Sequence, residues 1–322
     1  MVPIDADRLQ YIYHRLWVFF VDHHLLGPPA VVTGVVISLI AGEALFRDWN
    51  KTTAYRLFVR RSTSAKIDLV YYLLQYTGVV TLLEIVLSFG IAIGGNRLGN
   101  AAAEQLHWAR ITLPSDGIFE IAFSFLVYWI TGGLFGYWIH RMYHQPLFWN
   151  VHRFHHAAPE LNFLTAHRVH PLESLLRVFN FLSPLIILNV SESAMLVALF
   201  VGNFVNFCQH SELPWSWGWI GRWIFASPLV HQLHHSTDEE HRDSNFSNCP
   251  LWDHVFGTWY GGAKKPTEYG IGDPGYDRQP FRQFAHDTLV FYKSLGFVLS
   301  YPVRKVMSLW EVRAENPGAP AP

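Results

Sequence analysis

Four apolar stretches limit the folds that this chain can adopt. A helix needs roughly 20 apolar residues to cross the hydrocarbon core of a bilayer, and two of the stretches reach that length. A third is marginal, and the last is too long for one crossing and contains polar residues around Ser191. We therefore predict three spanning helices and one helical hairpin that turns near Ser191. The spans are expected at about residues 29–46, 67–94 and 117–139, and the hairpin at 174–207.

The composition supports a membrane protein. Charged residues make up 15% of the chain, against about 25% in typical soluble domains, which indicates that lipid is part of its solvent. The formal net charge of −1 gives no basic field, so no nucleic acid is expected as a partner. The sequence predicts an all-α fold, an integral membrane helical bundle in which residues 1–322 form a single domain.

The distribution of basic residues predicts the orientation. The loop 47–66 carries six Lys and Arg residues against one acid, whereas the loop 95–116 carries only Arg97 and Arg110. Basic loops remain in the cytoplasm, so 47–66 is expected there, and the crossings return the later loops to that side. We predict a multi-pass protein of a bacterial inner membrane or the endoplasmic reticulum. Its cytoplasmic histidine-rich cap would consist of residues 140–173 and 208–260, followed by an interfacial or disordered tail over 261–322.

Histidine is the residue type that points to chemistry. The chain has 18 histidines, and 13 of them lie between His140 and His254. Positions three and four apart on a helix share a face, so each of three short motifs can present its imidazoles together. The motifs are His140-Arg-Met-Tyr-His144, His152-Arg-Phe-His155-His156 and His231-Gln-Leu-His234-His235. They bring eight nitrogen donors to one predicted membrane surface.

Eight donors indicate two metal ions, because one ion is satisfied by about four to six ligands. Imidazole suits Zn, Cu, Fe and Ni. Structural zinc sites close with four ligands and commonly use cysteine, whereas this chain has two cysteines. Two iron ions with O2 as co-substrate would supply an oxidant for an unactivated C–H bond, and the position beside the bilayer suggests a lipid substrate. His170 and His210 border the hairpin and are candidates to complete the ligand set.

The predicted metal ligands are thus His140, His144, His152, His155, His156, His170, His210, His231, His234 and His235. We expect no catalytic residue beyond these ligands. Metal-bound imidazoles donate their other N–H to a carboxylate or carbonyl, and the nearby acids are Asp253, Glu173, Asp238 and Glu239. The remaining histidines are expected to be ordinary core, interfacial or surface residues: His14, His23, His24, His107, His167, His241, His254 and His286.

These motifs resemble the fatty acid hydroxylase / sterol desaturase superfamily from about His140 to Tyr260. The resemblance also includes the block RVHPLE, the segment QHSEL and the run HQLHHSTDEEHRDSNFSNCPLWDHVFGTWY. It implies a helical membrane fold with a cytoplasmic cap, two metal ions, and hydroxylation or desaturation of a lipid. His170 and His210 match additional histidines of the family, while Asn206 stands where some members have a further histidine. After about residue 262 the chain departs from the family pattern.

The resemblance also bears on the electron source and on the alternatives. The HPGG haem loop of fused cytochrome b5 domains is absent from the sequence, which implies a separate electron-donor protein of the ferredoxin or cytochrome b5 type. Hydroxylation is favoured over desaturation by analogy with members that lack fused domains. A divalent-metal transport or storage protein remains an alternative, although transport sites lie near the bilayer midplane. A zinc-dependent lipid hydrolase or isomerase using metal-activated water is a third reading.

Overall fold

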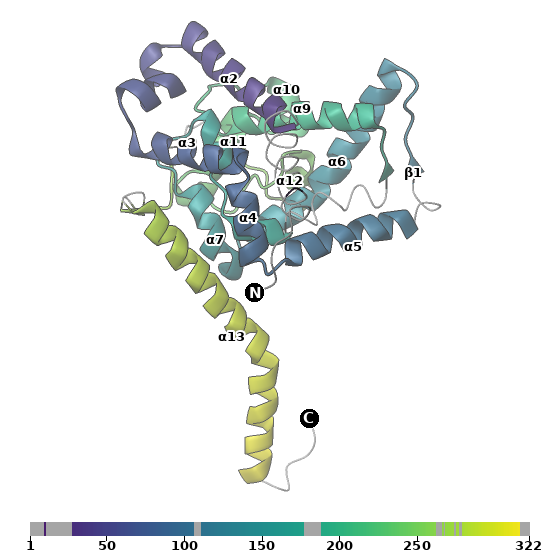
Figure 1. Cartoon of the computed structure of the whole chain (residues 1–322), viewed down its shortest axis with the longest axis vertical. Helices are drawn as coiled ribbons and strands as arrows, with labels where there is room; N and C mark the ends of the chain where they lie inside the picture. The colour runs from purple at the N-terminus through teal and green to yellow at the C-terminus, as the bar shows by residue number, and fades with distance from the viewer. Residues whose placement is uncertain are drawn as a thin grey trace.

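The computed structural model describes residues 28–105, 111–176, 188–261 and 279–315, together with residue 10 and most of 266–276. These residues are mostly helical (Figure 1). The longer helices are α2 (Pro28–Phe46), α3 (Thr63–Tyr76), α4 (Val79–Leu87), α5 (Ile91–Gln105), α6 (Ile118–Tyr143), α7 (Pro146–His156), α9 (Glu192–Gln209), α10 (Gly218–Trp223), α11 (Pro228–His234), α12 (Leu251–Phe256) and α13 (Pro280–Glu315). Short turns lie between them at η2 (Trp49–Lys51), η3 (Tyr55–Val59), η5 (Phe163–His167), η6 (Pro171–Glu173) and η7 (Glu239–His241).

The mostly helical part of the fold prediction is confirmed. The one sheet in the described residues is a two-residue parallel pair of β1 (Ile111–Thr112) with β2 (Leu188–Asn189), in which Ile111 lies opposite Leu188. This pair joins the chain just before α6 to the chain just before α9, so both helices start from the same end of the molecule (Figure 1). The carboxyl end of α6 carries His140, and His210 is the C-cap of α9.

One helix in the described residues, α6, is long and apolar enough to cross a membrane. The pair α3 and α4 passes the same test only when taken together, and it is bent by 80° at its break. The apolar part of α2, Val32–Phe46, is shorter than a full crossing. By length and composition the described residues therefore contain one candidate span, or two if the bent pair crosses as a unit.

The stretch 67–94, predicted as one span, is divided among α3, α4 and α5. Gly78 at the first break has φ of 77°, and Phe89 and Gly90 at the second break have φ of 51° and 75°. A positive φ interrupts the right-handed helix and is tolerated most readily by glycine. The prediction of a continuous helix is thus wrong here, because the apolar pattern carries no information on the two turns.

The predicted hairpin is described only in its second arm. Helix α9 begins directly after Ser191, whose side-chain oxygen accepts a hydrogen bond from the backbone N–H of Ala194 as an N-cap. The turn predicted near Ser191 therefore coincides with a helix start. The first arm falls largely on residues 177–187, which lie outside the described residues.

The C-terminal region contains a long helix. Residues 280–315 form α13, whose first half packs along α7, while its second half projects from the body (Figure 1). Phe291 is buried against Val151 of α7 and Leu172 of η6. Phe284 lies seven residues earlier, on the same face of the helix, and stacks on the ring of His170. This part of the chain therefore covers the helix that carries the second histidine motif.

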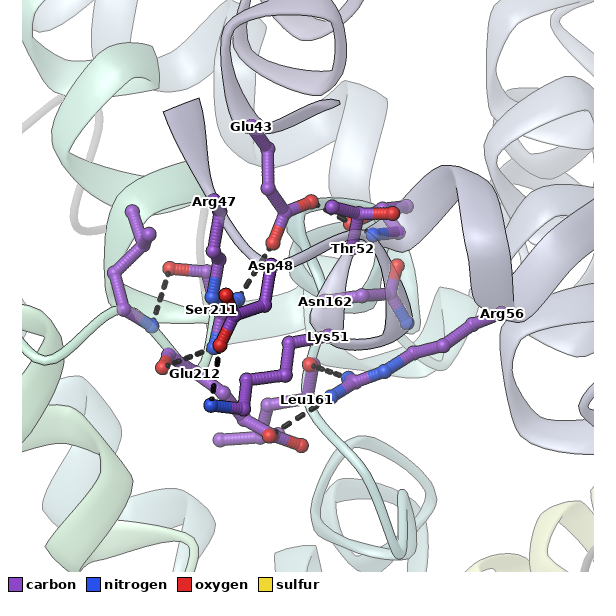
Figure 2. Close-up of polar contacts among 12 residues, drawn as sticks. Glu43, Arg47, Asp48, Lys51, Thr52, Arg56, Leu161, Asn162, Ser211 and Glu212 are labelled. Carbon is purple, nitrogen blue, oxygen red and sulfur yellow. Dashed lines mark hydrogen bonds and ion pairs between the residues drawn. The ribbon is translucent and has the colours of Figure 1, made fainter. Parts of the chain in front are cut away.

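The basic loop is tied directly to the predicted cap (Figure 2). The guanidinium of Arg56 donates to the carbonyl of Leu161 at 2.6 Å and pairs with the carboxylate of Glu212 at 2.8 Å. Arg47 donates to the backbone carbonyl of Glu212 at 2.9 Å. Arg56 is buried, so this contact is part of the fold and not a chance surface pairing. The loop and the cap therefore lie at the same end of the molecule.

Candidate metal centre

Nine of the ten predicted ligands gather into two clusters. In each cluster every residue offers one ring nitrogen, and these nitrogens all lie within 4.8 Å of one another. The five-histidine cluster consists of His140, His144, His152, His156 and His234, and the four-histidine cluster consists of His155, His210, His231 and His235. Two clusters of this size match the number of ligands that two separate metal ions require.

The two HxxHH motifs each serve both clusters. Helix α7 supplies His152 and His156 to the five-histidine cluster and His155 to the four-histidine cluster. With 3.6 residues per turn, side chains four apart differ by about 40° around the helix, whereas a residue and its next neighbour differ by about 100°. The first and third histidines therefore point together while the middle one points aside. The motif at α11 shows the same pattern with the clusters exchanged. His231 and His235 belong to the four-histidine cluster, and His234 belongs to the five-histidine cluster.

Two unprotonated ring nitrogens face each other in the four-histidine cluster. The Nδ1 of His210 lies 2.7 Å from the carbonyl oxygen of Asn206, and the Nδ1 of His155 lies 3.2 Å from that of Arg168. A carbonyl oxygen can only accept, so each Nδ1 carries the proton and each neutral ring leaves Nε2 unprotonated. These two Nε2 atoms are 3.1 Å apart. Two lone pairs at this distance repel unless a cation lies between them.

The five-histidine cluster contains an equivalent pair. The Nδ1 of His140 donates to the carbonyl of Phe246 at 2.6 Å, and that of His234 donates to the carbonyl of Ser244 at 2.7 Å. Their Nε2 atoms lie 3.0 Å apart. The buried Nε2 of His144 has no hydrogen-bond partner among the described residues. The residues of both clusters thus fit bound metal ions by the chemistry of their donor atoms.

Burial keeps these imidazoles neutral. Loss of solvent, with a further contribution from neighbouring imidazoles, lowers the pKa of His155, His156 and His231 well below the ordinary value. Burial lowers the pKa of His210 to about 4. Neutral imidazole is the form that binds a metal, so these rings are in the binding form at neutral pH.

Acidic and backbone groups orient the ligands. The carboxylate of Glu173 lies 3.1 Å from the Nδ1 of His152, and its other oxygen accepts from the backbone N–H of His170. Asp253 accepts from the backbone N–H groups of Phe246 and Ser247 at 2.8 and 2.9 Å, and so fixes the carbonyl that holds His140. Of the four acids that the sequence suggested as partners of the ligands, Glu173 contacts a ligand ring directly. Asp253 orients a ligand through the backbone.

Asp243 was missed by the sequence analysis. Its carboxylate lies 3.6 Å from the Nδ1 of His144, and this contact lowers the pKa of Asp243. It lies ninety-nine positions after His144 in the chain, and no local pattern connects the two. The other two acids serve no ligand in the described residues: Asp238 lies beside His241, and Glu239 is exposed.

The Glu173→Gln variant is expected to lower metal affinity by about 10–100-fold, which is the usual cost of losing a hydrogen-bond partner of a metal-bound imidazole. The neutral amide lacks the negative charge with which the Glu173 carboxylate stabilises the His152 ring. Metal content after dialysis against graded chelator measures the effect. Glu239→Gln is the matched control, and an equal loss in both variants would contradict the role of Glu173.

The structure does not bring His170 to either cluster. Its Nδ1 accepts from the backbone N–H of Leu172 at 3.2 Å, and its Nε2 lies 3.1 Å from the hydroxyl of Thr288 on α13. Both ring nitrogens are therefore engaged, and the residue acts as the N-cap of η6. We accordingly leave His170 out of the proposed ligand set. Sequence reasoning placed it near the right surface but could not see that α13 would cover it.

The other histidines also lie outside the clusters, where the structure describes them. His254 is stacked between Trp223 and Trp259, with ring centroids 4.0 and 4.6 Å away. His241 is buried beside Tyr260. His286 is largely exposed, next to Asp287, and His167 contacts Gln75. His14, His23, His24 and His107 lie outside the described residues.

A cavity of about 370 Å³ ends on both clusters. Its wall comes mainly from α6, and five of the clustered histidines line it: His140, His152, His155, His210 and His231. The α6 wall includes the small residues Gly132 and Gly136. The candidate metal centre is therefore reached by an internal space that borders the candidate membrane span.

Comparison with known proteins gives a consistent family. Residues 125–258 match the family model described as Fatty acid hydroxylase. The chain is similar to an alkylglycerol monooxygenase of Xenopus tropicalis, with 30% identity over 198 residues, or 59% of this chain and 42% of the relative. It is similar to an ornithine lipid hydroxylase of Rhizobium tropici, with 25% identity over 256 residues, or 79% of this chain and 73% of the relative.

A methylsterol monooxygenase of Aspergillus fumigatus is 27% identical over 162 residues, which cover 48% of this chain and 52% of the relative. The chain thus spans less than half of the frog relative and about half of the fungal one. No solved structure matches the chain significantly. The matched region contains all nine clustered histidines. The match of residues 125–258 to the Fatty acid hydroxylase family and the three relatives therefore agree with the superfamily that the histidine motifs resemble.

Proposed function

We propose that this protein is a membrane-bound oxidoreductase that holds two iron ions in its histidine clusters and uses O2 to hydroxylate a C–H bond of a lipid. The observation that carries the proposal is the pair of imidazole clusters, each with facing Nε2 lone pairs, at the end of one cavity. The three relatives, named as monooxygenases or hydroxylases of an alkylglycerol, an ornithine lipid and a methylsterol, support a lipid as substrate.

The residues of the chain would position the metal and the substrate. Hydrogen bonds from Nδ1 to fixed acceptors hold the rings with Nε2 turned inward, so little rearrangement is needed on metal binding. Bound iron would catalyse the reduction of O2 on which oxidation of the C–H bond depends. Zinc can occupy the same nitrogen ligands, because it outcompetes iron(II) for them. The cavity wall between Gly132 and His140 would bring a substrate carbon to the clusters and keep water away.

The proposal requires an external supply of electrons. Inserting one oxygen atom of O2 into a C–H bond releases the other as water, which consumes two electrons and two protons. We propose that a separate ferredoxin or cytochrome b5 type protein provides these electrons, as the resemblance to the superfamily implies. Desaturation of the same substrate would consume the same reductant but leave no oxygen in the product.

Isotopic labelling tests the proposed function. Cells that express the protein are grown under 18O2, and their lipids are compared with those of cells that lack it. We expect a hydroxylated lipid that carries one 18O atom and disappears when His210 is replaced with alanine. A new hydroxyl group that takes its oxygen from water would instead support a zinc-dependent hydrolytic enzyme and contradict the proposal.

We further propose that α6 crosses the membrane and that the histidine clusters and the basic loop share its cytoplasmic side. The hydrogen bonds from Arg56 and Arg47 to cap residues support a common side. Single cysteines at the exposed positions Thr63 and Glu240 are expected to react with an impermeant maleimide from the same side, and a cysteine at Ser115 from the opposite side. The native Cys208 and Cys249 are buried and should stay unlabelled. Labelling of Thr63 and Glu240 from different sides would contradict this topology.

The comparisons do not favour the alternatives. A metal transporter would hold its ions near the bilayer midplane, whereas all nine clustered histidines lie on or beyond the carboxyl ends of α6 and α9 or on α7 and α11. Three relatives are named for oxygenation of lipids and none of them for transport or hydrolysis.

A further inference from the structure

We propose that divalent metal ions enter and leave the protein at the five-histidine cluster, and that His144 is the ligand that moves aside to let them pass. The ion of the four-histidine cluster would stay enclosed while the other ion exchanges with the solution. This inference rests on the proposed function in one respect, because it takes both clusters as metal sites. It assigns a separate task to one ligand, His144, and to its partner Asp243.

The two clusters differ in their burial. All four residues of the four-histidine cluster are buried, whereas His140 and His144 of the five-histidine cluster are only partly buried. His140 lines the internal cavity, but the described lining of that cavity does not include His144. Beside His144 lies Asp243, whose side chain is 65% exposed. The exposed part of His144 therefore lies toward the outer surface and not in the cavity.

The ring of His144 is also held more loosely than those of five other ligands. In these five, Nδ1 lies 2.6–3.2 Å from a backbone carbonyl or from Glu173, whose side chain is 4% exposed: His140, His152, His155, His210 and His234. The Nδ1 of His144 lies 3.6 Å from the carboxylate of Asp243, which is beyond ordinary hydrogen-bond length. Water also competes for an exposed carboxylate, so this contact restrains the ring only weakly.

The surroundings of His144 allow its ring to move outward. The indole of Trp149 packs against this ring and against that of His156, with centroids 5.3 Å apart in both pairs, and Trp149 is itself partly exposed. His144 is the C-cap of α6, and the exposed Gln145 follows it. Because helix ends fray, a small movement of this last residue past Trp149 would turn the Nε2 of His144 toward the solution.

The five-histidine cluster can release one ligand and still hold its ion. With the His144 ring turned outward, four donors remain: His140, His152, His156 and His234. Four ligands are the number that the other cluster has, and they satisfy a zinc ion. The movement of His144 would therefore open one position to water or to an incoming ligand before the ion leaves.

The internal cavity is a less favourable route for an ion. Apolar side chains such as Ile139, Val169 and Ala198 contribute to its walls. A cation that leaves water for apolar surroundings loses its hydration at a large cost in free energy. At the outer surface beside Asp243, the ion stays hydrated until it meets the imidazoles.

Release of bound zinc tests the inference without turnover. The purified, zinc-loaded protein is mixed with excess EDTA, and the zinc that remains bound is followed with time. We expect two separate phases of about one ion each, the faster from the five-histidine cluster. Asp243→Asn should accelerate the faster phase about tenfold, the lower end of the usual cost of losing such a partner, and leave the slower phase unchanged. Glu239→Gln is the matched surface control and should behave as the parent protein.

His144→Ala and His234→Ala each remove one imidazole from the five-histidine cluster and should nevertheless differ. His144→Ala leaves four well-held donors, so it should still bind about two zinc ions and release the first of them faster than Asp243→Asn does. His234→Ala removes a ring that the carbonyl of Ser244 fixes and leaves the loosely held His144 as fourth donor, so it should bind about one ion. An unchanged slower phase establishes that each variant retains its fold.

The outcomes separate this inference from the proposed function. Only one zinc ion in His144→Ala, release of both parent ions in a single phase, or equal release from Asp243→Asn and Glu239→Gln would each overturn the role of His144. If zinc release follows the expected pattern but the iron-loaded protein inserts no oxygen into any lipid, the proposed function fails and this inference stands. If the protein oxygenates a lipid but His144→Ala loses its ion as His234→Ala does, the function stands and this inference fails.

Discussion

The His210→Ala variant is expected to bind about one metal ion per chain in place of about two, and to lose the oxidation of its lipid. His210 is one of four donors in the four-histidine cluster, and its removal leaves three imidazoles and a gap that only water can fill. Loss of a partner that merely orients a ligand costs about 10–100-fold in affinity or activity, so loss of the ligand itself should cost at least as much. Elemental analysis and product formation, both normalised to inserted protein, measure the two effects.

The controls for this variant are histidines outside the clusters. His254→Ala and His286→Ala should retain the metal content and turnover of the parent, since one ring is stacked between tryptophans and the other is largely exposed. The His234→Ala variant removes a donor of the five-histidine cluster and should behave as His210→Ala does. Parent-level metal in both ligand variants would refute the assignment of the clusters.

The Asp68→Asn variant is expected to lower the free energy of unfolding by about 3–5 kcal/mol, because it leaves a buried charge without its counterion. The carboxylate of Asp68 lies 3.5 Å from the guanidinium of Arg168, and both side chains are fully buried. The other carboxylate oxygen accepts from the side chains of Asn162 and Thr165 at 2.7 Å. Thermal unfolding of the purified protein should show a large decrease in Tm.

The same substitution should weaken metal binding at the four-histidine cluster. The carbonyl of Arg168 accepts from the Nδ1 of His155, and its guanidinium donates to the carbonyl of Phe154. Displacement of Arg168 would therefore disturb the orientation of a ligand as well as the packing. Asp48→Asn breaks an exposed pair with Lys51 and should leave Tm close to that of the parent protein, because water and salt screen an exposed ion pair. Equal Tm values for Asp68→Asn and Asp48→Asn would contradict the role of the buried pair.

Much of the candidate site could be predicted from the sequence, because ligands three and four apart on a helix carry a local signature. The motifs from His140 to His156 and from His231 to His235 indicated eight donors, and the structure gathers all of them. Helix geometry separates the middle histidine of each HxxHH motif from the other two, but the sequence could not show which histidines of the other helices it would join, since that depends on how α7 and α11 pack. His170 and Asp243 were misjudged or missed because their contacts join distant parts of the chain.

The fold was predictable only in part. The apolar stretch that became α6 is long and continuous, and its pattern alone predicts a helix. The stretch 67–94 has the same apolar character, but a left-handed turn at Gly78 divides it, and hydropathy does not register such turns. The packing of α13 on α7 depends on Phe284 and Phe291, which are spaced for a helical face but are too few to indicate a buried helix.

The metal content of active protein tests the central claim most directly. Protein produced in iron-supplemented cells, purified without chelator and shown to form the hydroxylated product, should contain close to two iron ions per chain. Its activity should fall in proportion when zinc replaces the iron. An active preparation with one iron ion or none, or one in which full replacement by zinc left oxidation intact, would contradict a pair of histidine-bound iron ions.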